Sequence, residues 1–305
     1  MAKPDIIIIG GGPAAMTAAL YSLRAGRSVL LLEKENFGGQ IADSPKVENF
    51  PAVPSIDGLG LSNQMFDQIT ALGAEFELDE ALSIVKEGDE FIVKGNYAEY
   101  RAKAVIIAAG VKHRHLNIEG EDQYAGKGVS YCAVCDGAFY ADRSVTVIGD
   151  ANSALQYALS LAKTSTHVDV VTLFDKFFAD PILVKALLSL QNVDIYHNKN
   201  AFRFYGDGDT LTGVEFKDTK TGEVLNLRNP GVFVAIGQIP DNNRFANLLD
   251  LEKGFIVTDD SMATKTPGLF AAGDCRDKKI RQLTTACADG AIAALSANSY
   301  LFTLE

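Results

Sequence analysis

Residues 5–15 read DIIIIGGGPAA, and this stretch decides the fold. The β-branched run Asp5–Ile9 is typical of a strand that is buried on both faces of a parallel sheet. The glycine-rich turn after it leads into an apolar-periodic helix that extends to about Ala25. A second strand, Ser28–Leu32, ends at Glu33. The stretch therefore predicts a strand–turn–helix–strand unit.

The same pattern occurs again about 139 residues later. The strand Ser144–Ile148 is followed by the turn GDANSA at 149–154, by a helix to about Lys163 and by a strand at Val168–Phe174. Two such units predict an α/β fold with two Rossmann-like domains.

The remaining runs and the short seams predict how the domains are arranged. Four further strands are expected at Ser83–Lys94, Tyr97–Ala108, Pro230–Ile236 and within 266–274, the last followed by a helix that ends the chain. The seams near 112–120 and 240–247 are short, so we expect the second domain to be inserted in the first. The predicted domains are a discontinuous one, 1–113 with 243–305, and an inserted one, 114–242.

Charge and composition exclude several classes of protein. The 305 residues carry a net charge of −11, whereas a nucleic-acid-binding protein needs a basic face to neutralise phosphates. No apolar run approaches the roughly 20 residues of a membrane span. The N-terminus lacks the apolar region of a signal peptide. We therefore expect a cytoplasmic protein that binds neither nucleic acid nor membrane.

Four cysteines occur, at Cys132, Cys135, Cys275 and Cys287. The first two have the Cys-x-x-Cys spacing, which brings two thiols within disulfide reach and is typical of redox chemistry. Asp136 directly follows and could carry protons during dithiol–disulfide exchange. The alternative, half of a zinc site, would need two further ligands, and neither a second Cys-x-x-Cys nor a paired histidine motif occurs. No metal is expected.

The first glycine turn fits a dinucleotide-binding fingerprint. Gly10, Gly12 and Ala15 match G-x-G-x-x-G/A, and Glu33 lies 23 residues after Gly10. The first glycine allows the tight turn, the second lets the backbone approach a pyrophosphate, and the acid can accept from ribose hydroxyls. The alternative is a helix-packing turn in an α/β domain that binds no nucleotide.

Five motifs together resemble one known family. They are GGGPAA at 10–15, GGQI at 38–41, VENFP at 47–51, CAVCDG at 132–137, and Gly273-Asp274 with Arg281-Gln282. Over essentially the whole chain they resemble low-molecular-weight thioredoxin reductases. The resemblance implies a homodimeric FAD enzyme with a discontinuous FAD domain and an inserted pyridine-nucleotide-type domain that bears the cysteines. Its expected partner is thioredoxin or a similar small disulfide protein.

The resemblance also implies roles for individual residues. The Gly10 turn and Glu33 would hold the ADP half of FAD, Asp274 the ribityl chain, and Gln282 the isoalloxazine region. Cys135 would face the flavin, Cys132 would exchange with the partner's disulfide, and Asp136 would act as acid and base. The full set of expected FAD contacts is Gly10, Gly12, Pro13, Ala14, Ala15, Glu33, Lys34, Gly39, Gln40, Ile41, Asn49, Ala109, Gly110, Gly273, Asp274, Arg281 and Gln282.

The second turn departs from the family pattern. Ordinary members keep glycines where this chain has Asp150 and Ala151, so a Cβ and a carboxylate stand where a pyrophosphate would bind. NADPH-using relatives also carry arginines after the next strand to hold the 2′-phosphate, whereas no arginine occurs here between residues 143 and 203. Lys176 lacks the guanidinium fork, and Asp175 would repel that phosphate or accept from the free ribose of NADH. These departures argue against NADPH.

A subgroup of the family resembles this pattern, namely the ferredoxin-dependent flavin thioredoxin reductases. This resemblance implies that reduced ferredoxin donates electrons to FAD. An acidic ferredoxin would need a local basic patch on a chain of charge −11. Two candidate patches are Arg276, Lys278, Lys279 and Arg281, and Lys112, His113, Arg114 and His115. The alternatives are an NAD(P)H-dependent reductase with an atypical nucleotide site and a non-catalytic flavin-binding protein.

Overall fold

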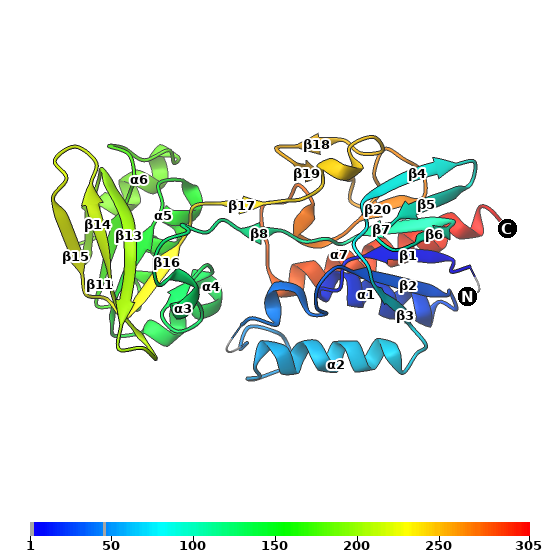
Figure 1. Cartoon of the computed structure of the whole chain (residues 1–305), viewed down its shortest axis with the longest axis horizontal. Coiled ribbons are helices and arrows are strands. Elements are labelled where there is room, and N and C mark those ends of the chain that lie inside the picture. The colour runs from blue at the N-terminus through cyan, green and yellow to red at the C-terminus, as the bar shows by residue number, and fades with distance from the viewer. Residues whose placement is uncertain (1–2, 45–46) are drawn as a thin grey trace. The chain divides into compact units, whose positions relative to one another are not determined.

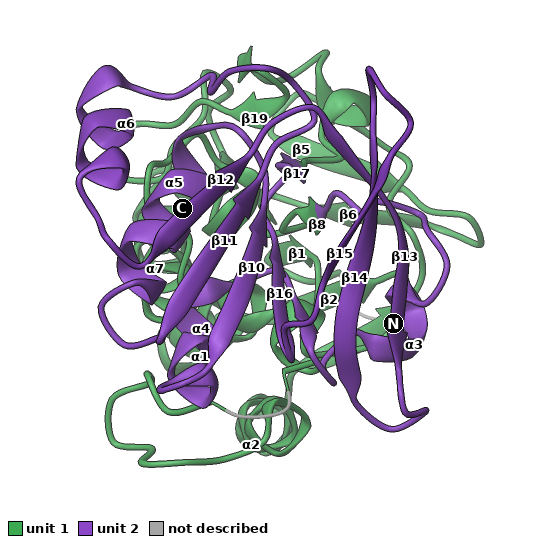
Figure 2. Ribbon diagram, turned by 90° about the vertical axis from the view of Figure 1, so that its left-hand side faces the viewer, with its two compact units in different colours: residues 1–112, 239–305 green, residues 113–238 purple. Residues whose placement is uncertain are grey.

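A computed structural model describes residues 3–44 and 47–305 of the chain. Two compact units are present, one made of residues 1–112 and 239–305 (unit 1) and the other of residues 113–238 (unit 2), as the colours of Figure 2 show. The chain passes between them twice, in β8 (Lys112–His113) and β17 (Gln238–Ile239), and these two short strands pair with each other (Figure 1).

Unit 1 is built on a five-stranded parallel sheet in the order β20-β7-β1-β2-β3. Its strands are β1 (Ile6–Ile9), β2 (Val29–Glu33), β3 (Glu75–Leu78), β7 (Ala104–Ile107) and β20 (Leu269–Ala271). The predicted first unit is present, with α1 (Pro13–Arg24) between β1 and β2. Because β1 is the central strand, the turn after it opens at the middle of the sheet's carboxyl edge.

The isoleucine run of β1 is continuous because both faces of the strand are covered. Ile6 and Ile8 pack in a core cluster with α1 and with α7 (Leu283–Phe302). Ile7 and Ile9 pack on the opposite face, in a cluster with the antiparallel sheet β4-β5-β6. Alternate side chains of a strand point to opposite faces, so a strand with two covered faces needs apolar residues at every position.

Two of the predicted long strands are pairs of shorter ones. The run 83–94 is a hairpin of β4 (Ser83–Glu87) and β5 (Glu90–Lys94), with Gly88 at φ +60° in its two-residue turn. The run 97–108 divides at Lys103 into β6 (Glu99–Ala102) and β7, which belong to different sheets. The predictions were wrong here because apolar residues on both sides of each break hide it from a pattern of hydrophobicity.

The other elements of unit 1 connect and cover these sheets. They are α2 (Gly58–Thr70), β18 (Leu251–Glu252), β19 (Phe255–Ile256) and the 3₁₀ turns η1 (Gly39–Ile41), η3 (Asn243–Phe245) and η4 (Gly273–Cys275). The helices α1 and α7 approach closely, since a Cβ at Gly290 of α7 would lie 2.2 Å from the carbonyl oxygen of Ala14. Among the described residues, no helix has the length and apolar character needed to cross a membrane.

Unit 2 repeats the plan of unit 1. Its parallel sheet has the order β12-β11-β10-β16-β9 and is accompanied by an antiparallel sheet β13-β14-β15. The parallel strands are β9 (Val129–Ser130), β10 (Ser144–Ile148), β11 (His167–Val171), β12 (Val193–Tyr196) and β16 (Gly231–Val234), and the antiparallel strands are β13 (Lys199–Gly206), β14 (Leu211–Asp218) and β15 (Val224–Leu227). Its helices and 3₁₀ turn are α3 (Glu121–Tyr124), α4 (Ala133–Asp136), η2 (Gly137–Tyr140), α5 (Asn152–Leu161) and α6 (Pro181–Leu188).

The predicted second strand–turn–helix–strand unit is β10, α5 and β11. Val145 and Val147 of β10 pack with α5 and α6, whereas Ile148 packs with the antiparallel sheet. The strand β11 ends at Val171, three residues earlier than predicted, because the Thr172 hydroxyl donates to the carbonyl oxygen of Phe174 and turns the chain there. The α/β fold with two Rossmann-like sheets is thus confirmed.

Candidate active site

The turn after β1 combines one glycine that the fold needs with one that leaves open space. Gly10 has φ +118°, and a Cβ there would lie 2.4 Å from the carbonyl oxygen of Ala108. Gly12 has φ −81°, and a Cβ there would meet, among the described residues, only the Cα of Gly39, at 3.9 Å. Gly12 is also the N-cap of α1, where no side chain caps the helix and Pro13 opens it. Free N–H groups beside open space form a cradle for an anion.

Glu33 stands at the end of β2, next to this turn. Gly11 makes room for its carboxylate, since a Cβ at Gly11 would lie 2.9 Å from Glu33 Oε2. Glu33 Oε1 accepts a hydrogen bond from the backbone N–H of Glu35 at 2.9 Å. Lys34 Nζ lies 4.0 Å from Glu35 Oε1. The acid therefore has the position beside the turn that a ribose-binding residue takes in dinucleotide folds.

A second glycine turn lies against the first. Gly38 has φ +115°, and its N–H donates to the carbonyl oxygen of Gly11 at 2.8 Å. The side-chain amide of Gln40, in η1 with Gly39 and Ile41, donates to the carbonyl oxygen of Val111. The segment before Val111 contains Ala109 and Gly110. Three chain segments predicted to touch the cofactor are therefore joined by hydrogen bonds.

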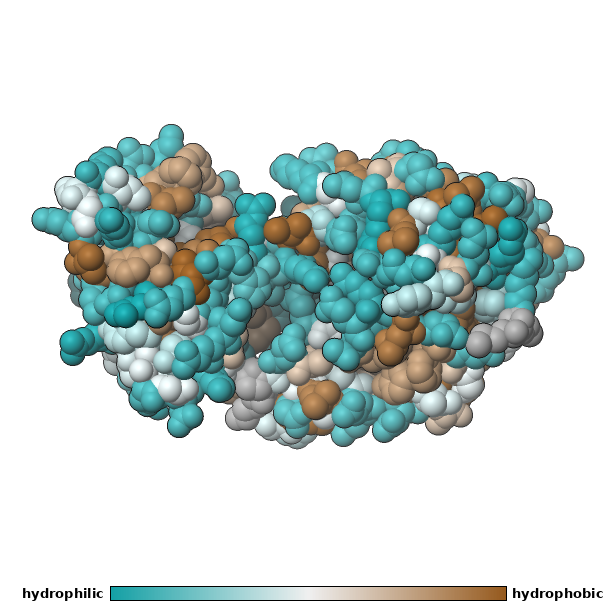
Figure 3. Space-filling view, in the orientation of Figure 1, coloured by the Kyte–Doolittle hydropathy of each residue, from teal (hydrophilic) through white to brown (hydrophobic). Residues whose placement is uncertain are grey.

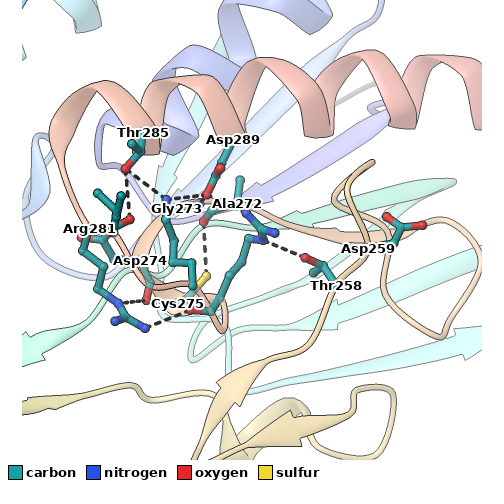
Figure 4. Close-up of polar contacts among 12 residues, drawn as sticks. Thr258, Asp259, Ala272, Gly273, Asp274, Cys275, Arg281, Thr285 and Asp289 are labelled. Atoms are coloured by element: carbon teal, nitrogen blue, oxygen red, sulfur yellow. Dashed lines mark hydrogen bonds and ion pairs between the residues drawn. The ribbon is translucent and has the colours of Figure 1, made fainter. Parts of the chain in front are cut away.

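The loop after β20 contributes a buried acid (Figure 4). Asp274 has a buried Oδ1 that lacks a hydrogen-bond partner within the described part of the chain, and burial raises the pKa of this carboxyl group. The loop is fixed by Asp289 of α7, whose Oδ2 accepts from the N–H of Gly273 at 3.1 Å. The same oxygen pairs with Arg276 at 2.9 Å and with Lys278 at 2.8 Å. Asp274 is thus held in place with one oxygen left unsatisfied.

Arg281 and Gln282 follow this loop. Arg281 Nε donates to the carbonyl oxygen of Asp274 at 3.2 Å, and its guanidinium lies 4.2 Å from the ring centre of Phe255. Gln282 is the N-cap of α7 and exchanges capping hydrogen bonds with Thr285. The side chain of Asn49 donates to Gln282 Oε1 at 3.5 Å. The structure therefore brings two distant predicted contacts together.

These residues of unit 1 fit a bound dinucleotide such as FAD. They gather at the carboxyl ends of β1, β2, β7 and β20, the edge where nucleotides bind in parallel sheets. The open space beside Gly12 suits a pyrophosphate, Glu33 suits a ribose, and the unsatisfied Asp274 Oδ1 suits a further hydroxyl. A buried carboxylate oxygen without a partner is costly in a folded protein, and a ligand hydroxyl would satisfy it.

The redox pair lies in unit 2, where Cys132 and Cys135 form a disulfide with a Cα–Cα distance of 5.3 Å. Cys132 is the N-cap of the single turn α4, which follows the edge strand β9 and contains Cys135, and the N–H of Cys135 donates to Cys132 Sγ at 3.2 Å. The other two cysteines are free. Cys275 is fully buried, which raises the pKa of its thiol to about 11, and burial also raises the pKa of Cys287.

Asp136 lies beside this disulfide with its two oxygens in different states. Oδ2 accepts from the Ser130 hydroxyl at 2.6 Å, whereas the buried Oδ1 has no partner among the described residues. Burial raises the pKa of Asp136, and the hydrogen bond from Ser130 opposes this rise. A carboxyl group with a raised pKa and a free oxygen can take up a proton and release it again.

The second turn, Gly149–Ala151, is contacted by the segment that follows β11. The N–H of Phe178 donates to the carbonyl oxygen of Asp150 at 2.7 Å, and Phe178 forms a bridge with Ala151. Asn152, the first residue of α5, exchanges two hydrogen bonds with Asp180, at 2.8 and 3.0 Å. A carboxylate of the chain therefore lies at the helix terminus where a pyrophosphate binds in related folds.

The first predicted basic patch is largely neutralised. Arg276 and Lys278 both pair with Asp289, and Arg281 is bound to backbone carbonyl groups. Within the described residues Lys279 is left as its exposed cation. Interpreting all four residues as a free docking surface was wrong, since these cations hold the Gly273–Asp274 loop together.

Sequence reasoning missed Ser130, Asp289 and the Asn152–Asp180 pair. Asp289 could have been identified from the sequence, because it is a charged residue on the alanine-rich, buried face of α7. Ser130 had none, since a serine two residues before a cysteine has no diagnostic spacing. The Asn152–Asp180 pair joins residues 28 apart and depends on how the chain returns after β11.

Comparisons with known proteins agree with this geometry. The pyridine nucleotide-disulphide oxidoreductase family model matches residues 4–290. The thioredoxin reductase of Bacillus subtilis is 41% identical over 302 residues, which cover 99% of this chain and 96% of that protein. The crystal structure of the thioredoxin reductase of Streptococcus pyogenes has a TM-score of 0.94 at 38% identity, covering 99% of both chains.

A more distant structure is a ferredoxin-flavin thioredoxin reductase from Clostridium acetobutylicum, with a TM-score of 0.55 and 26% identity over 100% of this chain and 99% of that one. The family match over nearly the whole chain and the identity to thioredoxin reductases settle the classification. This chain belongs to the thioredoxin reductases of the pyridine nucleotide-disulphide oxidoreductase family and is a flavin disulfide oxidoreductase.

Proposed function

We propose that this enzyme passes electrons from reduced ferredoxin, through FAD and the Cys132–Cys135 pair, to the disulfide of a thioredoxin, without using NAD(P)H. The observation that carries the proposal is the start of α5, where Ala151 places a Cβ beside the turn and the Asp180 carboxylate is hydrogen-bonded to the side chain of Asn152, the first residue of the helix. A homodimer stays a prediction from the family resemblance.

The two glycine turns, Gly10–Gly12 and Gly149–Ala151, differ in the room they leave for a bound pyrophosphate. At the first turn, a Cβ on Gly12 would meet only the Cα of Gly39, at 3.9 Å, within the described residues. At the second turn the equivalent residue is Ala151, which already has a Cβ and is bridged to Phe178. Asp180 is exposed and adds a negative charge near this terminus, which would repel a second anion there.

The region that would hold a 2′-phosphate exposes several apolar side chains, and its charged residues Asp175 and Lys176 include no arginine. Leu173, Phe174 and Phe178 are 46%, 49% and 56% exposed, and apolar surface lies among the polar surface of unit 2 in Figure 3. The rings of Phe174 and Phe178 pack edge to face at 5.3 Å, and Lys176 Nζ lies 5.3 Å from the ring centre of Phe178. Exposed aromatic rings give a phosphate no hydrogen-bond donor, so NADPH would lack its usual anchor.

Ferredoxin as the donor is supported by the whole-chain likeness to the ferredoxin-flavin enzyme of Clostridium acetobutylicum. When bound, FAD supplies the ability to take up electrons singly and deliver them as a pair, which links a one-electron donor to a disulfide. The residues of unit 1 that would hold it are the Gly10–Gly12 turn, Glu33 and Asp274. Lys279 is an exposed cation beside that last loop and could contact an acidic donor.

The dithiol then reduces the partner. The Cys132 thiolate attacks one sulfur of the thioredoxin disulfide, that bond breaks, and a mixed disulfide forms. The Cys135 thiol gives its proton to Asp136, and the resulting thiolate attacks Cys132 Sγ. The Cys132–Cys135 bond re-forms, thioredoxin leaves with two electrons, and its thiolates take up two protons.

The test is an anaerobic titration of the purified enzyme with NADPH, NADH and reduced ferredoxin, followed by flavin absorbance. We expect ferredoxin to bleach the flavin and micromolar nicotinamide cofactors to leave it oxidised, with dithionite as the control that the flavin can be reduced. Rapid bleaching by NADPH or NADH would contradict the proposal. It would establish an NAD(P)H-dependent reductase, the reading that the 41% identity to the Bacillus subtilis enzyme favours.

Turnover distinguishes the third possibility. With ferredoxin and thioredoxin both present, we expect continuous oxidation of ferredoxin and the appearance of thioredoxin thiols. A Cys135→Ser variant should stop turnover and accumulate the mixed disulfide through Cys132, which identifies the partner. A flavin-containing protein whose dithiol never reacts would instead be a non-catalytic flavin-binding protein.

A further inference from the structure

The hydroxyl of Ser130 joins the two groups that the exchange reaction uses. It donates to Asp136 Oδ2 at 2.6 Å and accepts the N–H of Cys132 at 3.1 Å. A hydroxyl has one proton and two lone pairs, so Ser130 can donate to Asp136 and accept from Cys132 at the same time. Ser130 is buried.

The position of that hydroxyl is set by the sheet. Ser130 is the last residue of β9, and the parallel pairing of β9 with β16 places it opposite Phe233. The turn α4 starts three residues later, and the N–H of Asp136 donates to the carbonyl oxygen of Cys132 at 3.1 Å. The backbone of Cys132 and the carboxylate of Asp136 are therefore both attached to one point on a rigid strand.

We propose that Ser130 is a positioning residue for the dithiol exchange: it fixes Asp136 through Oδ2 and thereby keeps the buried Oδ1 free to take the proton of the Cys135 thiol. The inference rests on the proposed function, in which Asp136 is the acid and base. A second observation supports this role. Within the described residues Oδ1 of Asp136 has no hydrogen-bond partner, a state that a freely rotating carboxyl group would not maintain.

The surroundings of Asp136 make its proton sensitive to Ser130. Burial raises the pKa of Asp136, and the Ser130 hydrogen bond lowers it. Tyr140 of η2 and Tyr157 of α5 face this carboxylate, and its charge helps to raise the pKa of both phenols, so they are neutral at physiological pH. Among the described side chains, Ser130 is therefore the one neutral hydrogen-bond donor that stabilises the charged form of Asp136.

The experiment follows the reoxidation of the dithiol directly, without any physiological donor. The enzyme is reduced anaerobically with dithionite, freed of excess reductant and mixed in a stopped-flow instrument with a chromogenic aryl disulfide or with oxidised thioredoxin. Attack by Cys132 and then by Cys135 releases two aryl thiolates in sequence. A Cys132→Ser, Cys135→Ser double variant measures the background from Cys287. Rates are recorded from mildly acidic to mildly basic pH.

Ser130→Ala should shift the acid limb of the pH–rate profile to higher pH for the second phase, the attack by Cys135. Losing a hydrogen bond to a carboxylate raises its pKa by about one unit, so below the limb this phase should be about tenfold slower. Ser130→Thr keeps the hydroxyl and should restore the wild-type profile. Asp136→Asn should abolish the limb. Ser165→Ala is the matched control, because it removes another buried serine hydroxyl of unit 2 and should change nothing in this profile.

The outcomes separate the two proposals. A Ser130→Ala profile that equals the wild type, or one that is lowered equally at every pH, would overturn the positioning role, and so would failure of Ser130→Thr to restore the limb. If the wild-type dithiol reacts with the aryl disulfide but not with thioredoxin, the proposed function fails, while the aryl disulfide still decides the role of Ser130. Thermal melts of each variant confirm that the fold is retained.

Discussion

Gly12→Ala and Gly10→Ala should affect different properties, although the two glycines belong to the same turn. The first should weaken ligand binding, and the second should destabilise the fold. Gly12 has an extended backbone that any residue adopts, and a Cβ there would meet only the Cα of Gly39, at 3.9 Å, in the described part of the chain. Gly10 has φ +118°, and a Cβ there would lie 2.4 Å from the carbonyl oxygen of Ala108. The first variant tests the ligand site and the second tests the fold.

The magnitudes follow from these contacts. For Gly10→Ala, the positive φ costs about 1–2 kcal/mol and the clash with backbone a further 1–3 kcal/mol, roughly 3 kcal/mol together. In a unit of this size that lowers the melting temperature by roughly 6–12 °C. Gly12→Ala should change the stability of the apoprotein by less than about 1 kcal/mol. Its Cβ would instead stand in the pyrophosphate space and weaken FAD binding by at least about tenfold.

The assay separates folding from binding by using the apoprotein, stripped of flavin and titrated back with FAD. Melting of the apoprotein gives stability, and quenching of flavin fluorescence gives affinity. Gly26→Ala is the control, because Gly26 has φ +80° with no atom within 4 Å of a built Cβ, so it reports the cost of positive φ alone. Wild-type FAD affinity in Gly12→Ala, or apoprotein destabilisation equal to that of Gly10→Ala, would refute the reasoning.

Three further variants test the fold and the flavin loop. Asp79→Ala should destabilise unit 1 by about 3 kcal/mol in denaturant titrations, because the buried carboxylate accepts from three backbone N–H groups and from Tyr100. Burial lowers the pKa of His113 from 6.5 to about 4, so the unfolded chain binds this proton first and stability falls as pH drops through that window. His113→Phe should remove about 3 kcal/mol of that fall. Asp289→Asn should weaken FAD binding several-fold in fluorescence titrations by loosening the N–H of Gly273, while dithiol exchange is unchanged.

Local patterns were enough to predict the parallel sheets and their turns. The run Ile6–Ile9 and its counterpart Ser144–Ile148 are strands because both faces are covered, and continuous apolar residues report that fact directly. The hairpin at Gly88 was missed, since both of its strands also bury apolar side chains and the turn contributes only two residues. Hydrophobic runs therefore predict which residues are buried better than they predict where the chain reverses.

Side chains that hold other side chains in position could not be predicted from the sequence. The motif Cys-x-x-Cys-Asp predicts a dithiol and an acid, but the state of each Asp136 oxygen depends on where β9 places the Ser130 hydroxyl. Asp289 likewise acts through Gly273, which lies 16 residues earlier. Such contacts come from the pairing of strands and from the packing of α7 on α1, and neither has a fixed spacing along the chain.

The two glycine turns of this protein explain why a motif can be recognised and still not bind its usual ligand. Each turn joins a central strand to a helix, so the sequence pattern predicts a nucleotide-binding loop at both. What differs is the segment that returns to them. Gly39 approaches the first turn with no side chain and leaves space beside Gly12. At the second turn, the N–H of Phe178 donates to the carbonyl oxygen of Asp150, and the Asp180 carboxylate accepts from the side chain of Asn152. Restoring glycine at 150 and 151 would remove two Cβ atoms and one carboxylate but would leave Asp180 at the helix terminus. The loss of nucleotide binding that we propose therefore depends on the returning segment as much as on the loop.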